Sequence, residues 1–107
     1  MAFFFVAENQ LGKPVGQIRF DIEGDEAAVS VSVGPQFRGY GLGSDLIRKA
    51  CELIIGESKI KTIHALIKEK NTASIRAFDK AGFAIADNII HKEFKTIIML
   101  YGNQADK

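Results

Sequence analysis

The sequence holds a single cysteine, two histidines and no tryptophan among its 107 residues. Cys51 cannot form an internal disulfide, and this cysteine usage agrees with a reducing compartment, so we expect a cytoplasmic protein. Cys51, His64 and His91 are not spaced like a familiar set of metal ligands. The sequence therefore predicts no metal site and no zinc-stabilised fold.

A surplus of charge and a long apolar run are also missing. Lys and Arg number 14 against 13 for Asp and Glu. A net charge of +1 creates no overall positive potential that would attract nucleic acid or an anionic membrane. No apolar run approaches the roughly 18 residues that span a bilayer. The first run, Ala2 to Val6, lacks the basic flank of a signal peptide and is better explained as a strand. We expect one globular domain over residues 1–107.

Hydrophobic periodicity divides the chain into strands and helices. Alternating apolar residues in Val15–Ile22 and in Ala27–Val33 predict half-buried strands, and with Phe3–Ala7 they form an antiparallel meander that ends at Gly34-Pro35. Apolar residues three and four apart predict a helix over 41–55, which Gly56 stops. The remaining expected elements are a strand at Ile60–Ile67, a helix at Asn71–Ala81, and strands at Phe83–Ile90 and Lys95–Tyr101.

The second helix carries its own boundary signals. Asn71 is a good N-cap, and Gly82 stands where a residue of left-handed conformation ends a helix. Phe83 is expected to contact Phe78, because a hydrophobic pair often accompanies such a glycine. Cys51 lies on the apolar stripe of the first helix and is expected to be a small core residue.

The stretch Gln36–Ser44 places three glycines and an arginine between a strand and the first helix. Glycine reaches positive φ without strain, so several N–H groups can turn toward one point, and a helix N-terminus adds partial positive charge there. The pattern indicates an anion cradle suited to phosphate. A plain turn before a helix uses the same residues and is the alternative.

Two motifs together resemble the GNAT superfamily of N-acetyltransferases. Arg38, Gly41 and Gly43 fit its Arg-x-x-Gly-x-Gly pyrophosphate loop, and Asn71-x-x-Ser74-x-x-x-Phe78-x-x-x-Gly82-Phe83 looks like its second helix and the exit into the next strand. The resemblance implies an α+β fold, with a mixed, mostly antiparallel twisted sheet and two helices. It also implies that the family's usual first strand and one or two helices are missing here, so we expect a fragment of a longer protein or a homodimer that supplies this wall.

The resemblance implies acetyl-CoA as acetyl donor and a small-molecule amine as acceptor. The pyrophosphate would lie on the backbone of Arg38–Ser44, and the pantetheine arm would pair with main chain at Val31 and Val33. Asn71 and Ser74 would lie on the cofactor side, with Phe78 close to the thiol. The cofactor-binding residues so implied are Val31, Val33, Arg38, Gly39, Tyr40, Gly41, Leu42, Gly43, Ser44, Asn71, Ser74 and Phe78.

The residues for proton transfer depart from the family's pattern. Many members carry Tyr, as general acid, where this chain has Phe78, so Tyr40 or Tyr101 is the substitute. Some members carry a Glu base where this chain has Leu66, two residues after His64 on the same strand face. His64 is therefore a candidate base, with a packed histidine as the alternative.

Three further polar residues border the region in which an acceptor would bind. Glu26 is a second candidate base, and a solvated turn residue is the alternative explanation for it. Arg19 and Asp21 either face an acceptor or simply alternate on an exposed strand face. These assignments rest on the resemblance together with the position of each residue along the expected strands.

The acceptor is the least determined part of the hypothesis. The stretches Val15–Asp21 and Ala73–Phe78 are most similar to members that acetylate amino groups of nucleotide-linked sugars in bacteria. A protein N-terminal amine and a polyamine are alternatives, as is a non-catalytic acyl-CoA-binding or regulatory module. A nucleotide-binding domain of another kind needs an acidic ribose partner after a strand, whereas Glu57 falls at a helix end.

Overall fold

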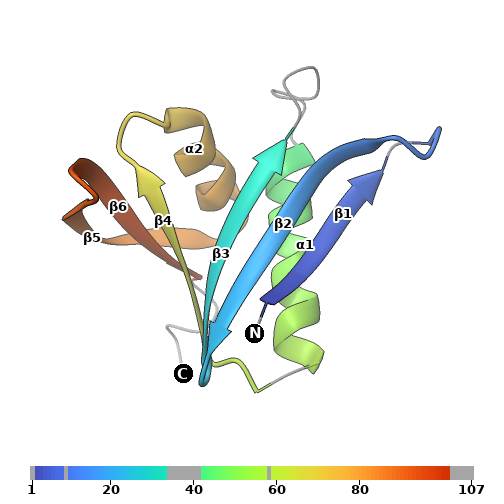
Figure 1. Cartoon of the computed structure of the whole chain (residues 1–107), viewed down its shortest axis with the longest axis horizontal. Coiled ribbons are helices and arrows are strands. Elements are labelled where there is room, and N and C mark those ends of the chain that lie inside the picture. Colours follow the sequence, from blue (N-terminus) through green and yellow to red (C-terminus); the bar gives the residue numbers. More distant parts are fainter. Residues whose placement is uncertain (1, 9, 34–41, 58, 102–107) are drawn as a thin grey trace.

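A computed structural model describes residues 2–8, 10–33, 42–57 and 59–101, which form one six-stranded sheet and two helices (Figure 1). The strands are β1 (Ala2–Glu8), β2 (Pro14–Glu23), β3 (Glu26–Val33), β4 (Thr62–Lys68), β5 (Phe83–His91) and β6 (Phe94–Tyr101). The helices are α1 (Leu42–Glu57), between β3 and β4, and α2 (Thr72–Lys80), between β4 and β5.

The sheet has the order β1-β2-β3-β4-β6-β5. All neighbours are antiparallel except β3 and β4, which run parallel and are joined through α1. Two-residue turns close two of the hairpins: Gly24 has a φ of 65° in the first, and Lys92 and Glu93 have φ values of 51° and 72° in the second. Positive φ at these positions matches the right-handed twist of the flanking strands.

Both helices contribute to a single hydrophobic core on one face of the sheet. Alternation places Ile18 and Phe20 of β2 on this face, where both are fully buried. The apolar side of α1 packs against this face through Ile47, Cys51 and Ile54. The other strands add the core residues Ala27, Val29, Ile63, Ala65, Ile67, Phe83, Ile97, Met99 and Tyr101.

The opposite face of the sheet is not covered by any element of the described part of the chain. Phe4 of β1, Leu66 of β4 and Phe94 of β6 lie on this uncovered face and are 54%, 43% and 53% exposed. Lys68 places its Nζ 4.2 Å from the centre of the Phe94 ring. The sheet is therefore a layer with a helix-covered face and an uncovered face.

The fold class expected from the sequence is confirmed, and so are the caps of α2. The Asn71 side chain accepts a hydrogen bond from the Ser74 N–H at 3.2 Å, Gly82 has a φ of 107°, and Phe78 and Phe83 stack edge to face with centroids 5.0 Å apart. The expected stop at Gly56 is wrong, because α1 runs through it to Glu57. A glycine costs about 1 kcal/mol in a helix, and the burial of Ile54 in the same turn offsets that cost.

Candidate active site

The two parallel strands separate soon after they begin. β3 and β4 pair only at Glu26↔Thr62, Ala27↔Ile63 and Ala28↔His64, although β3 continues to Val33 and β4 to Lys68. Figure 1 shows the two strands diverging toward their C-terminal ends. This wedge between β3 and β4 interrupts an otherwise continuous sheet.

The edge of β3 that faces the wedge carries backbone groups suited to an extended ligand. The Asp25 carbonyl accepts hydrogen bonds from the N–H groups of Lys61 at 2.7 Å and Thr62 at 3.2 Å, so it points toward β4. Successive residues of a strand direct their backbone groups to alternate sides. Val31 and Val33 therefore direct N–H and C=O toward the wedge, beyond the last residue pair with β4.

The first turn of α1 follows β3, after the glycine loop. Residues 34–41 lie outside the described residues, so the structure does not place Arg38, Gly39, Tyr40 and Gly41. Leu42, Gly43 and Ser44 form the start of α1, and Ser44 is 9% exposed. A helix N-terminus carries partial positive charge, which suits the anion predicted for this loop.

The start of α2 lies just after the C-terminal end of β4. Asn71 is held as the N-cap by its bond to Ser74, so both predicted cofactor-side residues lie at a second helix N-terminus. Phe78 is 2% exposed and belongs to the core, where it packs on Phe83. Tyr101 is also buried, with its ring centre 5.3 Å from that of Phe83. Both helices thus begin where the parallel strands end.

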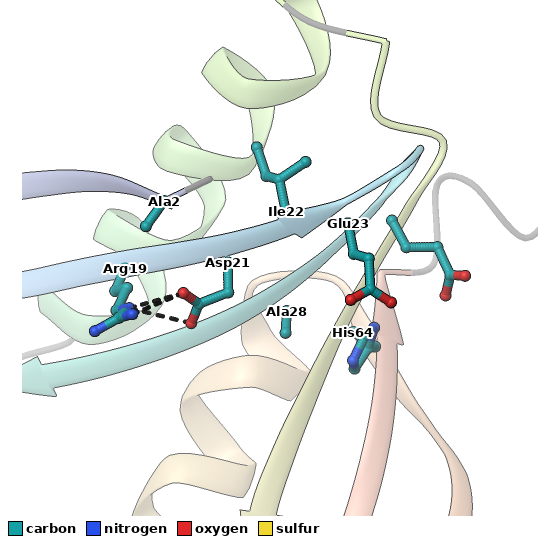
Figure 2. A pocket seen from close by; sticks show the side chains of 8 residues that line it. Ala2, Arg19, Asp21, Ile22, Glu23, Ala28 and His64 are labelled. Atoms are coloured by element: carbon teal, nitrogen blue, oxygen red, sulfur yellow. Dashed lines mark hydrogen bonds and ion pairs between the residues drawn. The ribbon is translucent and has the colours of Figure 1, made fainter.

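A pocket of about 470 Å³ opens on the uncovered face at the closed end of the wedge (Figure 2). His64, which belongs to the last residue pair between β3 and β4, lines it, and so does Glu26. The structure thus brings together the two bases predicted from the sequence. The full lining is Ala2, Arg19, Asp21, Ile22, Glu23, Glu26, Ala28 and His64.

Carboxylates dominate the charge of this pocket. Asp21 is paired with Arg19, whose Nη2 lies 2.9 Å from Oδ1, and the Arg19 guanidinium lies 5.3 Å from the centre of the Phe4 ring. Glu23 and Glu26 face each other across the two-residue turn. Glu23 has no role in the sequence hypothesis, although its alternation with Arg19 and Asp21 before Gly24-Asp25 places it on the same face.

Cys51 takes no part in this arrangement. It is fully buried beneath the sheet, and burial, with a smaller contribution from the charge of Glu52, raises the pKa of its thiol from 9.0 to about 12. The expectation of a core residue is confirmed.

Within the ranges that the structure describes, no group of three His, Cys, Asp or Glu residues is placed to hold a metal ion, and no helix is long and apolar enough to cross a membrane.

The sequence model of the Acetyltransferase (GNAT) family matches residues 1–83. The chain belongs to this family. The expected fold is confirmed as that of a GNAT acyltransferase. A search of curated proteins gave no match.

Solved structures of other GNAT proteins share the fold. The aminoglycoside acetyltransferase AAC(6')-Ib in complex with ribostamycin and coenzyme A superposes with a TM-score of 0.85 at 21% identity, over 98% of this chain and 66% of that one. A spermidine N-acetyltransferase, the SpeG F149A mutant from Vibrio cholerae, gives 0.86 at 15% identity, over 98% and 67%. The chain thus spans about two thirds of these relatives, and such identities establish the fold alone.

Proposed function

We propose that this GNAT chain is an acetyl-CoA-dependent N-acetyltransferase that moves an acetyl group to a primary amine of a small molecule. The observation that carries the proposal is the wedge between β3 and β4, whose closed end opens into a pocket lined by His64 and Glu26. An extended donor in the wedge would present its reactive end beside these two side chains.

The donor side is built from backbone. Main chain at Val31 and Val33 would pair with the pantetheine arm, and the N–H groups of Arg38–Ser44 would hold the pyrophosphate. Asn71 and Ser74 would bound the cofactor at the start of α2. Bound in this way, acetyl-CoA supplies an activated thioester. The buried ring of Phe78 has no hydroxyl to offer the leaving thiolate, so Tyr40 is the proposed acid.

The acceptor side is built from side chains. His64 takes a proton from the acceptor ammonium, and Glu26 is the second group able to do so. The neutral nitrogen then attacks the thioester carbonyl, a C–N bond forms and the C–S bond breaks. Tyr40 gives a proton to the departing thiolate, and the proton that the new amide nitrogen loses restores Tyr40. An amino group on a nucleotide-linked sugar is the first acceptor to test, and the amines named for the structural relatives, ribostamycin and spermidine, come next.

Calorimetric titration with acetyl-CoA, and in parallel with NADH and ATP, tests the donor. Thiol release over a panel of amines then tests the reaction. Of the three titrants, we expect only acetyl-CoA to bind, and we expect turnover of an amine in its presence. The His64→Ala variant should keep its affinity for acetyl-CoA but turn over at least about tenfold more slowly. A folded protein that does not bind acetyl-CoA contradicts the proposal, and binding without turnover of any amine favours a non-catalytic acyl-CoA-binding module.

A further inference from the structure

Ala28 occupies a special place in the pocket. The residue pairs Asp21↔Ala28 and Ala28↔His64 set Asp21, Ala28 and His64 in one row across β2, β3 and β4, on the uncovered face. The middle side chain of the row is a single methyl group between two larger polar ones. Figure 2 shows Ala28 at the floor of the pocket, between Asp21 and His64.

The size of this side chain is not dictated by the core. Ala28 faces away from the helices, whereas its neighbours Ala27 and Val29 are buried beneath them. Valine is a better strand former than alanine, so the fold would accept valine at this position. The small side chain instead keeps space open beside His64.

The charge of the pocket is also uneven. The bidentate pair with Arg19 compensates Asp21. Glu23 and Glu26 lie directly opposite each other, an arrangement that costs stability through like-charge repulsion, and neither has an ion-pair partner within the described part of the chain. A cation between them relieves that repulsion.

We infer that Ala28 and Glu23 determine which acceptors this GNAT chain accepts, an inference that rests on the proposed function. Ala28 leaves the room that an amine-bearing group needs beside His64. Glu23, together with Glu26, attracts the ammonium and repels a carboxylate attached next to it. The acceptor class is therefore an amine without an adjacent carboxylate, and α-amino acids are excluded.

The test uses 1,4-diaminobutane and ornithine, which differ by that carboxylate, titrated into the acetyl-CoA complex and assayed for thiol release. We expect the diamine to bind and ornithine to bind at least about tenfold more weakly. Glu23→Gln is expected to weaken diamine binding by about tenfold, and Ala28→Val by more, both with unchanged acetyl-CoA affinity.

Two matched variants control for general effects of the substitutions. Ser30→Val adds the same branched side chain on the same face of β3, outside the pocket lining, and Glu52→Gln removes a carboxylate from the exposed side of α1. Both are expected to behave as the wild type. Any of three outcomes overturns the inference. The wild type binds the two probes equally well, it binds acetyl-CoA but neither probe, or the Ala28→Val variant keeps the wild-type affinity for the diamine. Loss of acetyl-CoA binding by the wild type would instead contradict the proposed function.

Discussion

The thiol of Cys51 offers a quantitative test of the core beneath the site. Its pKa is raised from 9.0 to about 12 because the side chain is fully buried. In the unfolded chain the thiol releases its proton above about pH 9, whereas the native thiol keeps it. The unfolded state therefore binds fewer protons, and stability falls as the pH rises from about 9 to about 12.

The size of the effect follows from the two pKa values. Between about pH 8 and about pH 10.5, this single group should remove about 2 kcal/mol from the free energy of unfolding. Cys51→Ala abolishes the pH-dependent contribution and adds a pH-independent cost of about 1 kcal/mol for the lost packing. We expect the stability of the wild type to fall more steeply with pH than that of the variant.

Urea unfolding of both proteins at a series of pH values measures this difference, in which the titrations of lysine and tyrosine cancel. Parallel curves would refute the reasoning, since they require a native thiol that titrates near its ordinary pKa. The same burial predicts that native Cys51 reacts about 1,000-fold more slowly with thiol reagents near pH 8 than a free thiol does. A thiol-release assay then reports the coenzyme A product alone.

Two further outcomes concern α2. In urea unfolding, Asn71→Ala should lower the free energy of unfolding by about 1 kcal/mol, because the hydrogen bond from the Ser74 N–H is lost. Asn71→Ser should keep most of the wild-type stability, because serine is also a good N-cap. Equal stability of all three proteins would contradict the role of Asn71 as N-cap. Phe78→Tyr should lower stability by about 1–3 kcal/mol without raising turnover, because its hydroxyl enters the apolar contact with Phe83; unchanged stability with faster thiol release would instead place this ring at the thiol end of the cofactor.

Local signals make α2 and the hairpins predictable from the sequence. Asn71 and Gly82 fix the ends of α2 through interactions that span only a few residues, and alternation fixes the face on which Ile18 and Phe20 lie. Gly56 shows the limit of such signals, because packing of the helix beside it outweighs a single glycine's preference.

The pocket was harder to predict because it depends on strand register. His64 and Glu26 are 38 positions apart in sequence, and only the pairing of β3 with β4 brings them to one opening. Periodicity places Glu23 on a face but does not tell which strand lies beside it. The smallness of Ala28 carries no meaning until its neighbours Asp21 and His64 are known.

The short parallel ladder has a mechanical consequence. The sheet consists of two three-stranded halves, β1-β2-β3 and β4-β6-β5. In the described sheet, these halves are connected only by the residue pairs from Glu26↔Thr62 to Ala28↔His64. Within each half the strands pair over more residues, so fewer backbone hydrogen bonds oppose a change of the angle between the halves than a bend within one half. Because His64 lies in the last of these pairs and lines the pocket, a change of that angle would move one wall of the pocket.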